Sequence, residues 1–98
     1  REKIMTNAEI IANEHGRLAS EGVLKMVKVG EEVMPEPIHT FAKWKELGFS
    51  VKKGEHAVTK IAIWKGVTKK NEKEEDETKV FMKMSAFFAW SQVKKIEA

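Results

Sequence analysis

Cysteine is absent from the 98 residues of this chain, and only two prolines occur. Without cysteine the chain can form neither disulfides nor thiolate metal sites, which is typical of a cytoplasmic protein. No run of about 18 apolar residues and no signal-peptide pattern is present, so we expect no membrane-spanning segment. The chain begins at Arg1 rather than at a methionine, and we expect it to come from a longer protein.

Motifs for catalysis are also missing. The sequence contains no P-loop, no G-x-S-x-G element and no cysteine nucleophile. His15, His39 and His56 are scattered, and none stands at metal-ligand spacing from another ligand type. The acidic run from Glu74 to Glu77 reads as a solvated loop rather than as a cation site. We therefore expect a binding module with no cofactor and no metal, not an enzyme.

Charge is distributed unevenly along the chain. Residues 1–39 have a net charge of −2. Residues 40–70 contain eight basic and two acidic side chains, which gives a net charge of +6. Residues 71–78 carry −4 and residues 79–98 carry +3. A local cationic excess favours a polyanionic partner, although a lysine-rich solvated surface would give the same pattern.

The first predicted helix covers residues 6–21. Thr6 is a plausible N-cap, and Glu9 three residues later completes a capping-box pattern. Gly22 is a good C-terminal stop. Residues 23–29 are rich in β-branched side chains and favour a short strand over a continuation of the helix past Gly22.

A second, short helix is predicted after Thr40, which serves as its N-cap, and ends at Gly48. Phe41, Trp44 and Leu47 fall on one face of its two turns. We expect these three side chains to anchor the helix on a sheet.

A long hairpin dominates the second half of the chain. Residues 57–67 and 79–88 read as its two strands, and residues 68–78 as a mobile acidic tip without any apolar residue. Residues 94–98 read as a tail. The predicted fold is α+β, with an N-terminal helix and a second short helix packed on a small antiparallel sheet, in one domain spanning residues 1–98.

A hairpin that is symmetric about residues 72–73 would place Trp64 across from Phe81. Its core face would consist of four apolar residues, Ile61, Ile63, Met82 and Met84. Its opposite face would consist of two lysines and two aromatic residues, Lys60, Trp64, Phe81 and Lys83. A long tip allows slippage, and a shift of one residue would move side chains to the other face.

The run F-A-K-W-K-E-L-G-F-S-V-K-K-G-E-H-A-V at residues 41–58 is followed by a strand ending I-W-K and later by F-F-A-W-S-Q-V. Together these segments resemble the ArdC-like single-stranded-DNA-binding domain, found in plasmid antirestriction proteins and in related plasmid and phage proteins. The family pattern combines an aromatic-bearing helix, a glycine, V-x-K-G-E, a hydrophobic strand and F-F-x-x-x-Q. Its matches here are Trp44, Gly48, residues 51–55, residues 57–64, and Phe87 and Phe88 with Gln92.

Two departures limit what this resemblance implies. Longer family members carry N-P-x-[TS]-G-x-x-Y-x-G-x-N where this chain has G-E-E-V-M-P-E-P-I-H at residues 30–39. Many also add a metallopeptidase-like domain with H-E-x-x-H, which this chain lacks. The resemblance therefore implies binding to single-stranded DNA but no peptidase chemistry.

A sequence-tolerant single-strand binder needs cations along the phosphate path and aromatic faces for the bases. The K-K-G-E turn can present Lys52, Lys53 and free backbone N–H groups to a phosphate, or it can be a simple hydrophilic turn. Trp44 and Trp90 read as core residues, whereas Trp64 could stack on bases or lie under a helix. The candidate nucleic-acid-binding residues are Lys43, Lys52, Lys53, Lys60, Trp64, Lys65, Phe81 and Lys83.

Two functions follow as hypotheses. In the first, the chain binds single-stranded DNA with little base specificity. In the second, it is a small anti-defence protein of a mobile element that binds and inhibits a host nuclease complex, and its acidic tip mimics nucleic-acid charge.

Overall fold

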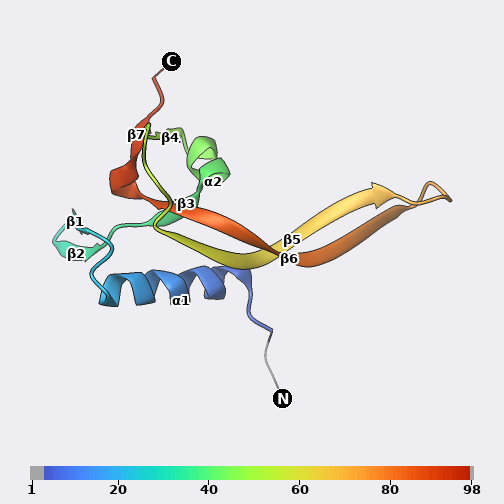
Figure 1. The fold of residues 1–98 in the computed structure, drawn as a ribbon, viewed down its shortest axis with the longest axis horizontal. Helices are drawn as coiled ribbons and strands as arrows, with labels where there is room; N and C mark the ends of the chain where they lie inside the picture. Colours follow the sequence, from blue (N-terminus) through green and yellow to red (C-terminus); the bar gives the residue numbers. More distant parts are fainter. Residues whose placement is uncertain (1–3, 98) are drawn as a thin grey trace.

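The computed structural model describes residues 4–97 and confirms an α+β fold with a long antiparallel hairpin (Figure 1). Within these residues, neither helix has the length and apolar character that crossing a membrane requires. The elements in chain order are α1 (Asn7–Ser20), β1 (Met26–Val29), β2 (Glu32–Pro35), β3 (Ile38–Thr40), α2 (Phe41–Glu46), β4 (Phe49–Val51), β5 (Thr59–Lys70), β6 (Asp76–Ala89), a 3₁₀ helix (Trp90–Gln92) and β7 (Val93–Lys95).

The strands form three antiparallel groups. The largest sheet has the order β3-β6-β5, while β1 pairs with β2 and β4 pairs with β7. Figure 1 shows α1 under the base of the β5–β6 hairpin and α2 with β4 and β7 on the other side of that base. The outer half of the hairpin extends away from the rest of the chain, and we call it the arm.

Helix α1 begins and ends as its capping residues predict. The Thr6 hydroxyl accepts a hydrogen bond from the Glu9 N–H at 3.2 Å, and the Glu9 carboxylate accepts one from the Thr6 N–H at 3.2 Å. Gly22, just beyond the helix, adopts a φ of 76°, which glycine allows at little cost. Local chemistry therefore suffices to set both ends of this helix.

Helix α2 is capped by Thr40, as predicted, but only one of its three expected anchors is buried. Trp44 is 2% exposed and donates its indole N–H to the Phe88 carbonyl at 2.8 Å. Phe41 and Leu47 remain 51% and 47% exposed, but the Phe41 ring packs edge-on against Phe88 of β6, with ring centroids 6.4 Å apart, so Phe41 does contact the sheet. Trp44 is thus the one buried side chain by which this six-residue helix is attached to the strands.

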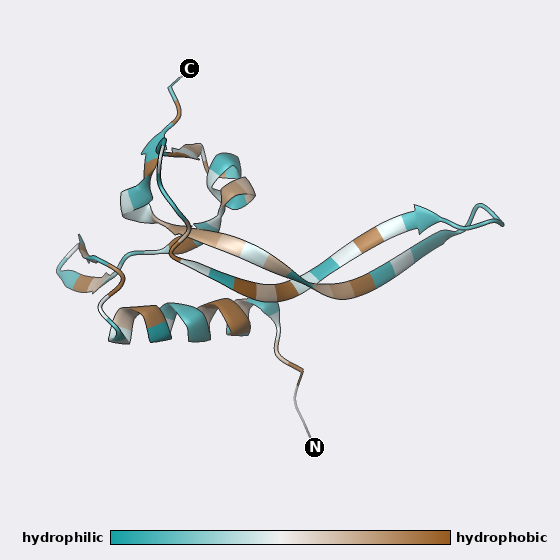
Figure 2. Cartoon of the chain, viewed as in Figure 1, coloured by the Kyte–Doolittle hydropathy of each residue, from teal (hydrophilic) through white to brown (hydrophobic). Residues whose placement is uncertain are grey.

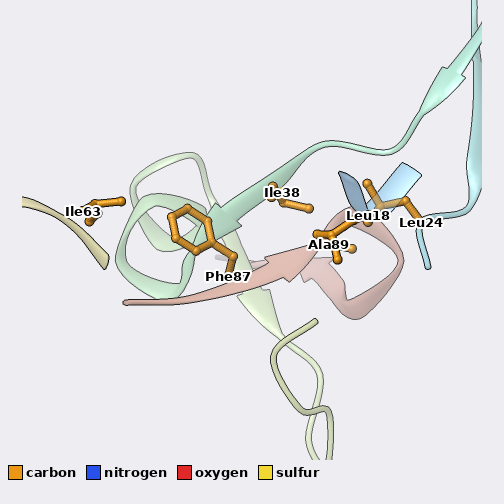
Figure 3. Packing of buried hydrophobic residues seen from close by; sticks show 6 residues of the cluster. All are labelled: Leu18, Leu24, Ile38, Ile63, Phe87 and Ala89. Carbon is orange, nitrogen blue, oxygen red and sulfur yellow. The ribbon is translucent and has the colours of Figure 1, made fainter. Parts of the chain in front are cut away.

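The core lies where α1 meets the base of the hairpin (Figure 3). Ile10, Ile11 and Ala19 of α1 pack against it, while Val58 and Ile61 close its other side. The hydropathy colouring shows the arm becoming hydrophilic toward its tip (Figure 2). The buried cluster consists of Leu18, Leu24, Ile38, Ile63, Phe87 and Ala89.

A buried carboxylate joins three segments near this core. Glu36 is 1% exposed, and its two oxygens accept hydrogen bonds from the N–H groups of Lys25 at 2.6 Å and Ser91 at 2.8 Å. The Glu36 backbone carbonyl also lies 2.8 Å from His15 Nε2. The side chain therefore ties the β1–β2 hairpin to the 3₁₀ helix, and burial of the charge is balanced by hydrogen bonds.

The hairpin tip is shorter than the sequence predicts. Strand β5 continues to Lys70 and β6 starts at Asp76, so only residues 71–75 form the loop instead of residues 68–78. The Asn71 side-chain oxygen accepts from the N–H groups of Lys73 at 2.9 Å and Glu75 at 3.0 Å. This Asx-type bonding gives the acidic tip a defined backbone path.

The C-terminal segment is also more ordered than expected. Lys94 and Lys95 belong to β7, where they pair with Ser50 and Phe49, and the Ile96 N–H donates to the Gly48 carbonyl at 2.9 Å. The prediction of a free tail is therefore wrong for residues 94–96. Ala98 lies outside the described residues.

Candidate nucleic-acid interface

The register of the β5–β6 hairpin decides which side chains share a face. Trp64 lies opposite Met82, and Lys65 lies opposite Phe81. Directly opposite residues of an antiparallel pair project from the same face. The expected pairing of Trp64 with Phe81 is therefore wrong by one residue.

This shift also corrects the predicted faces. Ile61 and Ile63 do face α1 and the core, but their cross-strand neighbours are Ser85 and Lys83 rather than methionines. Met82 and Met84 lie on the opposite face, 43% and 61% exposed. The four predicted members of one binding face are split into two pairs, Lys60 with Trp64 and Phe81 with Lys83.

The corrected register gathers lysines on one face of the arm. We call this surface the lysine face, and the ladder alternation places all its members on one side of the ribbon. Two of them, Lys69 and Lys79, were not among the predicted site residues because the first was assigned to the tip and the second had no assigned role. The lysine face consists of Lys65, Val67, Lys69, Lys79, Phe81 and Lys83.

The lysines of this face alternate between the two strands. Along the ribbon they follow the order Lys83, Lys65, Lys79 and Lys69, with one cation for every two residues of strand. That step corresponds to about 7 Å. Each of the first three lies opposite an apolar residue, whereas Lys69 lies opposite Glu77 at the outer end.

Phe81 lies in the middle of this ladder and is 42% exposed. It borders a hollow of about 370 Å³ along the arm, and Val67 and Lys79 line the same hollow. An exposed ring between ammonium groups offers a planar apolar surface with cations on both sides. This combination suits a base stacked on the ring and phosphates held beside it.

Trp64 and Lys60 occupy the other face of the hairpin. The Trp64 indole N–H donates to the Met5 carbonyl at 3.1 Å. Its backbone N–H and carbonyl are both hydrogen-bonded to the Asn7 side-chain amide, at 2.7 and 3.0 Å. Trp64 thus fastens the segment before α1 to the edge of β5, which also covers part of an open strand edge.

The K-K-G-E turn lies away from the arm, beside the 3₁₀ helix. The Lys52 N–H donates to the Gln92 carbonyl at 2.8 Å, and its ammonium group lies 3.2 Å from the Ser91 carbonyl. Gly54 adopts a φ of 88°, as the sequence predicts. Lys53 is exposed at the same turn.

Buried Gln92 connects this turn to the end of β6. Its side-chain N–H donates to the His56 carbonyl at 2.5 Å, and its side-chain oxygen accepts from the Ala89 N–H at 2.9 Å. The V-x-K-G-E and F-F-x-x-x-Q segments are therefore joined directly through one glutamine. This contact gives both motifs a structural role.

Lys43 projects from α2, where its ammonium group lies 3.6 Å from the Glu46 carboxylate. Nearby, burial and then the positive charge of Lys43 lower the pKa of His39. His39 also packs edge-on against Trp44, with ring centroids 4.7 Å apart. Within residues 4–97, the acidic and histidine side chains form no group of three that could hold a metal.

Trp90 departs most clearly from its predicted place. It was expected in the core, yet it is 44% exposed, while Trp44 beneath it is buried. The 3₁₀ helix turns the chain between β6 and β7 and leaves this indole at the surface. The exposure of Trp90 depends on how distant segments pack, and no local pattern in the sequence reveals it.

A family model described as the N-terminal domain of anti-restriction factor ArdC matches residues 26–93. The match covers every strand up to the first residue of β7, and so includes the whole lysine face and both motif segments. No curated protein and no solved structure matches the chain.

Proposed function

Since the chain belongs to the family of the N-terminal domain of anti-restriction factor ArdC, we propose that it is a non-enzymatic binding module for single-stranded DNA. The lysine face of the arm is the binding surface in this proposal. The observation that carries it is the alternation of four lysines with Phe81 and Val67 on one side of an exposed ribbon.

Electrostatics provides most of the affinity in this proposal. Each lysine that neutralises a phosphate releases condensed counterions, so binding weakens as salt increases. The lysines follow one another about every 7 Å along the ribbon, so they form a row of cations along which a single strand can lie.

Phe81 adds a contact that requires an unpaired base. Stacking of a base on an aromatic side chain is worth about 1–3 kcal/mol and depends little on which base it is. Bases inside a duplex present their edges and not their faces to a protein. A preference for single strands with little sequence specificity follows from this ring.

The test is a fluorescence anisotropy titration of labelled oligo-dT and of a duplex of the same length at 50 and 200 mM salt. The double variant K65E/K79E reverses two charges in the middle of the lysine face and should abolish most oligo-dT binding. The matched control K28E/K45E makes the same charge change on exposed lysines of the β1–β2 hairpin and of α2, away from the arm. Equal loss in both variants, or no oligo-dT binding by the wild type at 50 mM salt, would reject the proposal.

The acidic tip supports a second candidate function, inhibition of a host nuclease complex through protein contacts. Its loop is fixed by Asn71, and all acidic side chains of residues 72–77 are exposed. The test measures plasmid cleavage by a purified restriction endonuclease with and without the protein. If E72Q/E74Q/E75Q no longer inhibits cleavage while K65E/K79E still does, this function is supported. If K65E/K79E loses inhibition and E72Q/E74Q/E75Q retains it, inhibition depends on DNA binding instead.

A further inference from the structure

Trp90 packs against two other aromatic residues, Trp44 and Phe49. Its ring centroid lies 5.0 Å from that of Phe49 and 5.9 Å from that of Trp44. The Phe49 and Trp44 rings are themselves 5.6 Å apart. Two aromatic rings thus support the Trp90 indole, and 44% of its surface still faces solvent.

The support under Trp90 is held by hydrogen bonds. The Trp90 N–H donates to the Pro37 carbonyl at 3.1 Å, and the next N–H, of Ser91, donates to the buried Glu36 carboxylate. Below it, the Trp44 indole N–H is bonded to the Phe88 carbonyl. A ring on such a support loses little conformational entropy when a ligand stacks on it.

Two lysines lie on segments next to Trp90. The β4–β7 register places Lys95 directly opposite Phe49, so the lysine projects from the face on which Trp90 packs against Phe49. The Lys52 ammonium group lies at the carbonyl of Ser91, the residue next to Trp90.

An exposed indole on a fixed aromatic support, with Lys52 and Lys95 on neighbouring segments, complements a nucleobase with its phosphates. We propose that Trp90 stacks a base of single-stranded DNA and that Lys52 and Lys95 contact the adjoining phosphates. This contact is separate from the lysine face. The inference rests on the proposed function, binding of single-stranded DNA. A strand long enough to reach both surfaces gains affinity from the linkage.

The test uses W90F and W90A with oligo-dT, and follows both affinity and tryptophan emission. Stacking on Trp90 should quench the wild-type emission, and W90F should remove most of this quenching. The matched control W64F changes the tryptophan that is bonded to the Met5 carbonyl on the other face, and should retain the quenching. W90A should weaken binding of a long oligo-dT about tenfold, the loss expected for one stacked base.

Two further results separate this inference from the proposed function. If W90F and W90A bind oligo-dT with the affinity and the quenching of the wild type, the stacking site is overturned while the proposal for the lysine face stands. K65E/K79E should bind oligo-dT more weakly than the wild type. If the complex that it still forms shows quenching that disappears when Trp90 is also replaced, the two contacts are separate. Since W90A could destabilise the fold, K95E supplies a second variant at an exposed position and should weaken binding without changing the unfolding midpoint.

Discussion

Lys65 and Phe81 lie directly opposite each other in the β5–β6 ladder, so their side chains project from the same face of the arm. Both are exposed, and Lys69 and Lys79 continue the same face toward the tip. An ammonium group beside an exposed ring is the centre of the proposed DNA contact. The following predictions test the structure that holds this arm and its base in place.

Replacing Glu36 with alanine should destabilise the fold by about 2–4 kcal/mol, because the N–H groups of Lys25 and Ser91 would lose their acceptor. Urea unfolding followed by circular dichroism measures the change. Glu31→Ala, at the exposed turn between β1 and β2, is the matched control and should change stability by less than about 0.5 kcal/mol. Equal stability of the two variants would show that the Glu36 bonds contribute nothing.

Gln92→Ala should cost about 2 kcal/mol, since the His56 carbonyl and the buried Ala89 N–H would both lose a partner. The loss should be concentrated at the turn that Gln92 holds. Amide hydrogen exchange should therefore increase for residues 52–56 more than for the outer arm. An increase spread evenly over the chain would contradict a local role for this side chain.

The carboxylate of Glu14 should make stability depend on pH in the acid range. A hydrogen bond from Arg17, together with one from the Thr59 hydroxyl, lowers the pKa of Glu14 from 4.5 to about 2 despite partial burial. The folded state therefore favours the charged form, and this stabilisation is present above pH 4.5 and is lost as the pH falls toward 2.

Urea unfolding midpoints measured between pH 2 and pH 6 test this dependence. Glu14→Gln should lower stability at pH 6 and flatten the decrease between pH 4.5 and pH 2. Glu31→Gln removes a charge at an exposed position and should leave the slope almost unchanged. A slope in Glu14→Gln as steep as that of the wild type would rule out this carboxylate as the source.

The sequence predicts what local chemistry determines. Thr6, Glu9 and Thr40 cap their helices as expected, and Gly54 adopts its positive φ, because each depends on residues within one turn. The α+β class follows from the same signals. The burial of Glu36 and the exposure of Trp90 depend on contacts between distant segments, and no local pattern reveals them.

The predicted register of the hairpin is wrong for an identifiable reason. An even-numbered loop would be symmetric about residues 72–73, but Lys70 pairs with Asp76 around a loop of five residues. Asn71 favours that loop through its bonds to Lys73 and Glu75, and Glu74 adopts a φ of 61° within it. An asparagine at the loop start is the signal that could have indicated the odd-numbered loop, and with it the lysine face.

The salt dependence of oligo-dT binding tests the lysine face most directly. With four lysines on phosphates, the logarithm of the association constant should fall with the logarithm of salt concentration with a slope of about −3. Lys79→Ala should reduce the steepness of that slope by about 0.7, whereas Lys28→Ala at the β1–β2 hairpin should leave it unchanged. A slope that Lys79→Ala does not alter would contradict DNA binding on this face of the arm.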